Sequence, residues 1–183
     1  MQNDVVMAGF GGQGILLIGK MLAYAGMREG KEVSWLPSYG PEMRGGTANC
    51  TVVISDRPVG SPVIQSPQAV VAMNLPSLDK FEPDVRPGGL LLINTSLINR
   101  ETTRTDLKVV NVPANEIANE LGNRRGANMV ALGAYLGATG AVSVDGIVEV
   151  VRETFAAKPG VIEVNITALH RGHEIGAATA VGV

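Results

Sequence analysis

The chain has 183 residues, of which 45% are hydrophobic, and this is enough to bury the core of one domain spanning residues 1–183. The formal net charge of −2 offers no basic surface, so neither nucleic acid nor an anionic membrane is expected as a partner. The single cysteine, Cys50, excludes an internal disulfide framework and any site built from several cysteines. With no signal peptide and no membrane span at the start, a cytoplasmic protein is expected.

Short apolar runs alternate with helical patterns through the first two-thirds of the chain, and the last third is helical. This alternation predicts an α/β fold: a three-layer, Rossmann-like, open and mostly parallel sheet with helices on both faces and a helical C-terminal third. The expected strands cover residues 4–8, 31–36, 48–55, 69–73, 90–93 and 108–112. The expected helices cover residues 15–25, 76–81, 114–121, 128–139, 144–158 and 161–179.

A glycine-rich loop, Gly9-Phe10-Gly11-Gly12-Gln13-Gly14, joins the first strand to the first helix. Its spacing matches the dinucleotide fingerprint, in which glycines allow a tight turn and a pyrophosphate lies at the helix N-terminus. An NAD site also requires an acidic residue at the end of the second strand, and here the residues are Trp35-Leu36-Pro37-Ser38. The alternatives are a tight turn without a ligand and a loop that meets another subunit or a different ligand.

A second loop, Ser38-Tyr39-Gly40-Pro41-Glu42-Met43-Arg44-Gly45-Gly46, follows the second strand. In a parallel sheet both loops are expected at the carboxyl ends of neighbouring strands, where such folds bind ligands. Tyr39 can stack and donate a hydrogen bond, whereas Glu42 and Arg44 can pair locally or point apart. The alternative is a solvated surface loop.

No catalytic constellation is apparent in the sequence. His170 and His173 are expected on a solvated helix face, Cys50 as a buried small side chain, and Asn128 as a helix cap. Five methionines are expected to fill the core: Met7, Met21, Met27, Met73 and Met129. Chemistry within this chain alone is therefore not expected.

The two loops at this spacing, followed by a strand that ends Val53-Ile54-Ser55-Asp56, resemble the gamma subunit of 2-oxoacid:ferredoxin oxidoreductases. The likeness continues through Asn94-Thr95-Ser96 and the helix start at residues 128–133, so it covers essentially the whole chain.

The resemblance implies a subunit of an oxidoreductase that acts on the oxo group of its donor and uses an iron–sulfur protein as acceptor. The complex oxidatively decarboxylates a 2-oxo acid, transfers the acyl group to coenzyme A and reduces ferredoxin. Thiamine diphosphate and [4Fe-4S] clusters would be held mainly by the alpha, beta and ferredoxin-like delta subunits. The gamma chain would be inactive alone and could form a homodimer when isolated.

By this resemblance, ten loop positions are candidates for the edge of the active site or for subunit contact, with Arg44 meeting an anionic group of a cofactor, coenzyme A or substrate. They are Gly11, Gly12, Gln13, Gly14, Tyr39, Gly40, Glu42, Arg44, Gly45 and Gly46. The amino-acid sequence of the second loop favours 2-oxoglutarate or a branched-chain oxo acid over pyruvate as substrate. A stand-alone nucleotide-binding protein and a purely structural subunit remain as alternatives.

Overall fold

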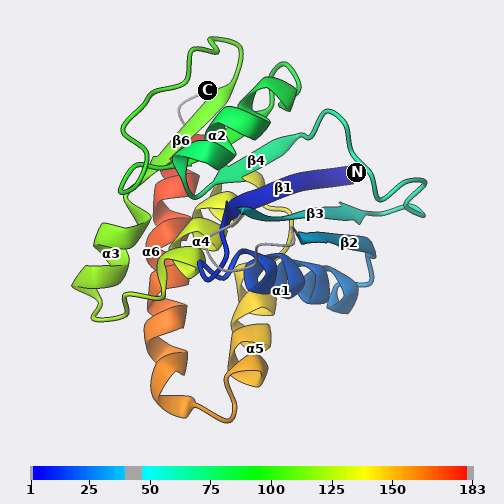
Figure 1. Ribbon diagram of the computed structural model, residues 1–183. Coiled ribbons are helices and arrows are strands. Elements are labelled where there is room, and N and C mark those ends of the chain that lie inside the picture. The colour runs from blue at the N-terminus through cyan, green and yellow to red at the C-terminus, as the bar shows by residue number, and fades with distance from the viewer. Residues whose placement is uncertain (1, 40–46, 181–183) are drawn as a thin grey trace.

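The computed structural model describes residues 2–39 and 47–180, which form one six-stranded sheet with helices on both faces (Figure 1). The strands lie in the order β2-β3-β1-β4-β5-β6. Their bounds are β1 (Gln2–Phe10), β2 (Glu32–Tyr39), β3 (Thr47–Ser55), β4 (Ala69–Ala72), β5 (Leu90–Asn94) and β6 (Lys108–Val112). All six expected strands are present.

Strands β1, β4, β5 and β6 pair in parallel, whereas β3 pairs antiparallel with both β1 and β2. Five strands therefore point the same way and only β3 is reversed, so the expected mostly parallel sheet is confirmed. The expectation that the first two strands are neighbours is wrong, because β3 lies between them. Only seven residues separate β2 from β3, too few for the crossover that parallel neighbours require.

The inserted strand still leaves the ends of β1 and β2, from which the two loops start, at one edge of the sheet. Phe10 at the end of β1 pairs with Thr47, and Tyr39 at the end of β2 pairs with Ala48. The carboxyl ends of β1 and β2 are therefore level and one strand apart, so the two loops start from the same edge of the sheet.

The helical bounds agree with the sequence-based expectation to within one residue, except that α1 continues to Arg28 instead of ending at residue 25 and that α5 ends early. The helices are α1 (Ile15–Arg28), α2 (Leu75–Phe81), α3 (Ala114–Glu120), α4 (Ala127–Thr139), α5 (Val144–Thr154) and α6 (Ile162–Ala180), with single 3-10 turns at Glu82–Asp84 and Pro159–Val161. Helix α5 was expected to reach residue 158. It ends at Thr154, and Pro159 accounts only for the exclusion of Lys158, because a proline disfavours helical backbone at the residue before it.

The two faces of the sheet are covered unequally. Helices α1, α4 and α6 pack on one face and enclose the larger hydrophobic core, in which α4 is buried along its first ten residues. On the other face, a smaller cluster joins Val70, Leu91 and Ile93 to Leu78 of α2 and to Ile98. Strand β2 presents Leu36 to solvent at 41% exposure.

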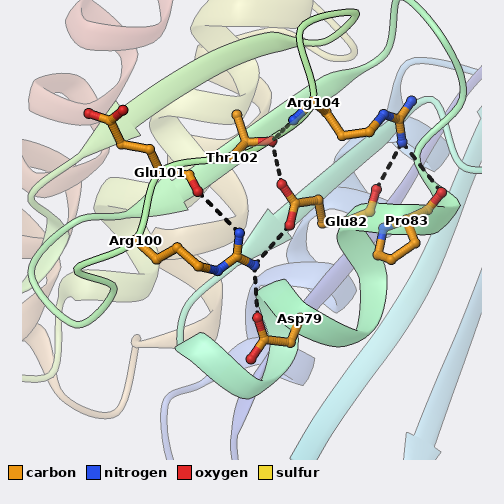
Figure 2. A network of polar contacts seen from close by, with 7 residues as sticks. All are labelled: Asp79, Glu82, Pro83, Arg100, Glu101, Thr102 and Arg104. Atoms are coloured by element: carbon orange, nitrogen blue, oxygen red, sulfur yellow. Dashed lines mark hydrogen bonds and ion pairs between the residues drawn. The ribbon is translucent and has the colours of Figure 1, made fainter.

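A network of charged groups fastens the segment around Ile98 to α2 (Figure 2). Arg100 donates to the carboxylates of Asp79 and Glu82, each at 2.8 Å. The hydroxyl of Thr102 donates to the other carboxylate oxygen of Glu82. Arg104 donates to the backbone carbonyl of Glu82 at 3.1 Å. The carboxylate of Glu82 is thus buried but accepts several hydrogen bonds, and these offset the free-energy cost of burying its charge.

Helices α4 and α6 approach so closely that their contact requires glycine. A Cβ atom built on Gly133 would lie 1.9 Å from the carbonyl oxygen of Leu169, and one on Gly172 would lie 1.9 Å from that of Val130. The many glycines of the chain are therefore partly explained by this backbone-to-backbone packing.

Candidate functional site

The glycine loop makes the tight strand-to-helix turn that its sequence predicts. Gly12 has φ 96° and Gly14 has φ 74°, and both values favour glycine. Gly14 is the N-cap residue of α1 and provides no side chain to cap it. A Cβ atom on Gly14 would also lie 2.3 Å from Nδ2 of Asn128, so two independent constraints require glycine there.

Gln13 holds this loop against the end of β4. Its Oε1 accepts from the backbone N–H of Phe10 at 2.6 Å, and its Nε2 donates to the carbonyl of Met73 at 3.4 Å. A Cβ atom on Gly9 would lie 2.5 Å from that same Oε1. The side chain of Gln13 is therefore used to shape the loop.

Three asparagines that sequence reasoning did not select as site residues lie at the same edge of the sheet. Nδ2 of Asn94 donates to the carbonyl of Met73 at 3.2 Å and to Oδ1 of Asn115 at 2.8 Å, and its Oδ1 accepts from Ala114 N–H at 3.2 Å. Asn74 caps α2 by accepting from Ser77 N–H at 2.9 Å. The sequence signal that could have indicated these residues was an asparagine at the end of each of two apolar strands: Asn74 follows the apolar run of β4, and Asn94 ends β5.

Asn74 and Ser77 each leave a buried polar atom without a partner among the described residues. These atoms are Nδ2 of Asn74 and Oγ of Ser77. Both residues are 1% exposed. Buried polar atoms are normally paired, so this pair marks a place where the edge of the sheet retains unused hydrogen-bonding capacity.

Asn128 is not the helix cap that was expected. The N-cap of α4 is Gly126, and Asn128 lies inside the helix. Its side chain instead donates to the carbonyl of Gly14 at 3.3 Å and accepts from Met129 N–H at 2.9 Å. Asn128 thereby joins α4 to the glycine loop.

The second loop lies almost wholly outside the described residues. Tyr39 is the last residue of β2, and its backbone pairs with Ala48. The expectations for the side chain of Tyr39 and for the remaining loop positions stay predictions; those outside the described residues are Gly40, Glu42, Arg44, Gly45 and Gly46.

The described residues do not supply ligands for an iron–sulfur cluster. No group of three histidine, cysteine or carboxylate residues in this part of the chain could hold a metal ion. Cys50 is fully buried, and its burial raises the pKa of the thiol to about 12, although the nearby indole of Trp35 opposes this. The expectation that Cys50 is a buried small side chain is confirmed.

Two further expectations can be compared with burial. Both histidines were expected on a solvated face of the last helix. On α6, His170 is exposed as expected, whereas His173 is half-buried. Met27 is 59% exposed, so its assignment to the core is wrong, whereas the other four methionines are buried. Among residues 2–39 and 47–180 no helix is both long and apolar enough to cross a membrane.

Comparison with known proteins places these features in a family. The model of a protein family described as "Pyruvate ferredoxin/flavodoxin oxidoreductase" matches residues 4–175, which is nearly the whole chain. The chain belongs to this family.

Within the pyruvate ferredoxin/flavodoxin oxidoreductase family, the chain is 45% identical over 170 residues to ketoisovalerate oxidoreductase subunit VorA of Methanothermobacter marburgensis. That match covers 92% of this chain but 35% of VorA, so the chain spans about a third of this relative. It is 36% identical over 182 residues to 2-oxoglutarate synthase subunit KorC of the same organism, covering 96% of this chain and 97% of KorC.

Two solved structures of this family have the same fold. The gamma subunit of keto/oxoacid ferredoxin oxidoreductase from Geobacter sulfurreducens has a TM-score of 0.86 at 30% identity and covers 98% of both chains. The 2-oxoglutarate:ferredoxin oxidoreductase of Magnetococcus marinus, described with 2-oxoglutarate, coenzyme A and succinyl-CoA bound, has a TM-score of 0.89 at 25% identity. That match covers 97% of this chain and 31% of the other, so the same unit occurs both alone and within a longer chain.

Proposed function

We propose that this chain is the gamma subunit of a 2-oxoacid:ferredoxin oxidoreductase that converts a 2-oxo acid and coenzyme A to an acyl-CoA and reduces ferredoxin. The observation that carries the proposal is the mutual coverage of 98% with the Geobacter sulfurreducens gamma subunit at 30% identity. The relation to KorC, which is matched over 97% of its length, supports the same assignment.

In this proposal the chain works with alpha, beta and delta subunits in the cytoplasm, and those subunits hold thiamine diphosphate and the [4Fe-4S] clusters. Thiamine diphosphate would supply carbanion stabilisation and the clusters electron transfer. The buried, weakly acidic Cys50 supports placing the clusters elsewhere, since iron–sulfur ligation requires several accessible thiolates. No step of the reaction is assigned to residues of the gamma chain.

The edge that carries both glycine-rich loops is the surface proposed to face the active site or the partner subunits. Residues 10–14 and the end of β2 lie together there, and close to the end of β4 Asn74 and Ser77 each have a buried polar atom with no partner among the described residues. Arg44 is proposed to meet an anionic group of a cofactor, coenzyme A or substrate. When isolated, the chain could dimerise through surface that its partners otherwise cover.

For the substrate, we infer 2-oxoglutarate or a branched-chain oxo acid in preference to pyruvate. The chain is 45% identical to a ketoisovalerate subunit and 36% identical to a 2-oxoglutarate subunit. It is 32% identical to pyruvate synthase subunit PorC of Methanothermobacter marburgensis.

Affinity purification of the tagged chain from its host under anaerobic conditions tests the assignment. The expected result is three larger or cluster-bearing partners, bound iron and coenzyme A-dependent dye reduction with a 2-oxo acid. A chain that elutes alone and is stabilised by a nucleotide would instead establish a stand-alone nucleotide-binding protein. In the whole complex, Arg44→Ala should weaken assembly, coenzyme A affinity or turnover, with Arg124→Ala as a surface control; no change in any of the three contradicts the role of Arg44.

A further inference from the structure

A cavity of about 200 Å³ lies where the parallel strands begin, at the edge of the sheet opposite to the one from which the glycine-rich loops start. Its walls come from the starts of β1, β4, β5 and β6 and from the C-terminal end of α4. Concave sites with a few converging polar groups are typical of small-molecule binding. The polar groups here include the side chains of Asn3, Asp4, Arg86, Lys108, Tyr135 and Thr139.

The wall built from the strand starts is held in shape by backbone hydrogen bonds. The N–H of Leu90 donates to the carbonyl of Gln68 at 2.8 Å. The N–H of Lys108 donates to the carbonyl of Gly89, also at 2.8 Å. A Cβ atom on Gly89 would lie 2.8 Å from the carbonyl oxygen of Gln68, so these segments approach too closely for any other residue. The cavity is therefore preformed, and a ligand would not have to order its wall.

A buried carboxylate is the main indication of a ligand. Asp4 lines the cavity and is 4% exposed. Its Oδ1 accepts from the N–H of Gln68 at 2.7 Å, whereas its Oδ2 accepts only from the side-chain amide of Gln2 at 3.4 Å, beyond the usual range for a hydrogen bond. Both donors are neutral, and Asp4 forms no ion pair with any described residue. Because a buried charge is normally paired, Oδ2 is available to a positively charged group in the cavity.

The end of α4 that lines the cavity does not neutralise Asp4. Burial raises the pKa of Tyr135 above its usual value of 10.0 and the nearby charge of Asp4 adds to this, although the hydroxyl of Thr139 opposes it, so the phenol stays uncharged. Helix α4 has no basic residue in its last turn. The partial negative charge at its C-terminus therefore adds to the charge of Asp4. This side of the cavity favours a cation.

Two cations give the cavity a second charged side. Arg86 and Lys108 both line it, and neither forms an ion pair with any of the described residues. A simple cation bound here would be repelled by these two groups, and a simple anion by Asp4 and the end of α4. A molecule that carries an ammonium group and a carboxylate a few bonds apart complements both sides.

We propose that this cavity binds a small zwitterion of the α-amino acid class. The ammonium group donates to Oδ2 of Asp4, and the carboxylate accepts from Arg86 and Lys108. The volume of about 200 Å³ and the apolar side chains of Leu90 and Ala138 in the lining suit a small aliphatic side chain. The cavity is at the opposite end of the strands from the glycine-rich loops, and the proposal does not depend on the oxidoreductase assignment.

Titration calorimetry on the full chain tests the charge pattern without any substitution. The probes are glycine, L-alanine and L-valine, together with isobutylamine, which is valine without its carboxylate, and isovalerate, which is valine without its amine. The expected result is saturable binding of at least one amino acid with a Kd below about 10 mM, and binding of each single-charge analogue that is about tenfold weaker or more. Equal binding of isobutylamine indicates a simple cation site and equal binding of isovalerate a simple anion site, and either result overturns the proposal, as does the absence of saturable binding for all three amino acids.

Substitutions then locate the binding. Asp4→Asn keeps an oxygen that can accept from Gln68 but removes the charge, so it should weaken amino acid binding about tenfold or more, and Lys108→Gln should weaken it as well. Asp145→Asn and Arg124→Gln are the matched controls, because both residues are exposed and outside the cavity lining, and they should bind as the unaltered chain does. Thermal unfolding checks that each variant is folded. Unchanged binding in folded Asp4→Asn, or equal weakening in the controls, overturns the proposal; if Asp4→Asn does not fold, Lys108→Gln and the single-charge analogues decide.

Discussion

The side chain of Asn128 donates a hydrogen bond to the backbone carbonyl of Gly14 at 3.3 Å, across 114 positions of the sequence. This contact ties the buried helix α4 to the turn that begins α1. It also fixes how close the two elements lie, because Nδ2 of Asn128 occupies the space where a Cβ atom of residue 14 would stand. The shape of the first glycine loop is thus set by a residue from the C-terminal third.

Gly14→Ala should destabilise the fold more than Gly12→Ala. Both residues have positive φ, which costs alanine about 1–2 kcal/mol. Only at Gly14 does the new methyl group clash, with Nδ2 of Asn128 at 2.3 Å, whereas a Cβ atom on Gly12 meets nothing within 4 Å. We expect urea unfolding to give a loss of about 1 kcal/mol for Gly12→Ala and about 2–4 kcal/mol for Gly14→Ala.

A double-mutant cycle separates strain from clash. Asn128→Ala removes the obstructing amide, so Gly14→Ala should cost less in that background than in the unaltered chain. If the cost of Gly14→Ala is the same in both backgrounds, Asn128 does not set the requirement for glycine.

Gly172→Ala should be among the most destabilising single changes in the chain. A Cβ atom there would lie 1.9 Å from the carbonyl oxygen of Val130, and since both groups belong to backbone, α4 and α6 would have to separate. We expect a loss of about 3 kcal/mol or more, measured by thermal or urea unfolding. Gly60→Ala is the control, because its Cβ atom meets nothing within 4 Å, and it should change the stability by about 0.5 kcal/mol or less.

Cys50 should be inert to thiol reagents in the native protein. Its side chain is fully buried, and burial raises the pKa of the thiol to about 12, so almost no thiolate is present near neutral pH. Labelling with a chromogenic disulfide at pH 8 should be slow in buffer and rapid in denaturing urea. Rapid labelling of the folded chain contradicts this burial.

The order and type of the elements followed from the sequence because strand and helix patterns are strong and local. The alternation of apolar runs with helical spacing gave all six strands, and Pro159-Gly160 marked the boundary before α6. The place of β3 between β1 and β2 did not follow, because strand order is decided by pairing between segments and not by the pattern within them. The short connection between β2 and β3 was the one indication in the sequence that these two strands pair antiparallel as neighbours.

The site was predicted less completely than the fold. The glycine loop could be recognised from spacing alone, since its glycines serve backbone geometry within a few residues. The partners of Gln13 and Asn128 could not be recognised, because Met73 and Gly14 come into reach only when distant elements pack. Asn128 was expected to cap its own helix, and the structure shows that a neighbouring loop uses the side chain instead.

Glu82→Gln should make stability less dependent on pH in the acidic range. Burial by itself raises the pKa of Glu82, but hydrogen bonds from Thr102 and Arg100 outweigh it, so the pKa is lowered from its usual value of 4.5. The stabilisation is therefore present above about pH 4.5 and is lost as the pH falls through the lower folded-state pKa.

At pH 7 the Glu82→Gln variant should be less stable by about 1–3 kcal/mol, because Arg100 and Thr102 lose a charged acceptor. As the pH falls below 4.5, its unfolding free energy should converge with that of the unaltered chain, which loses the same contacts by protonation. Urea unfolding from pH 7 down to pH 3 measures both curves. Glu101→Gln, an exposed neighbour whose side chain makes no ion pair among the described residues, should run parallel to the unaltered chain. A constant gap between the Glu82→Gln and unaltered curves at every pH would contradict the role of the Glu82 charge.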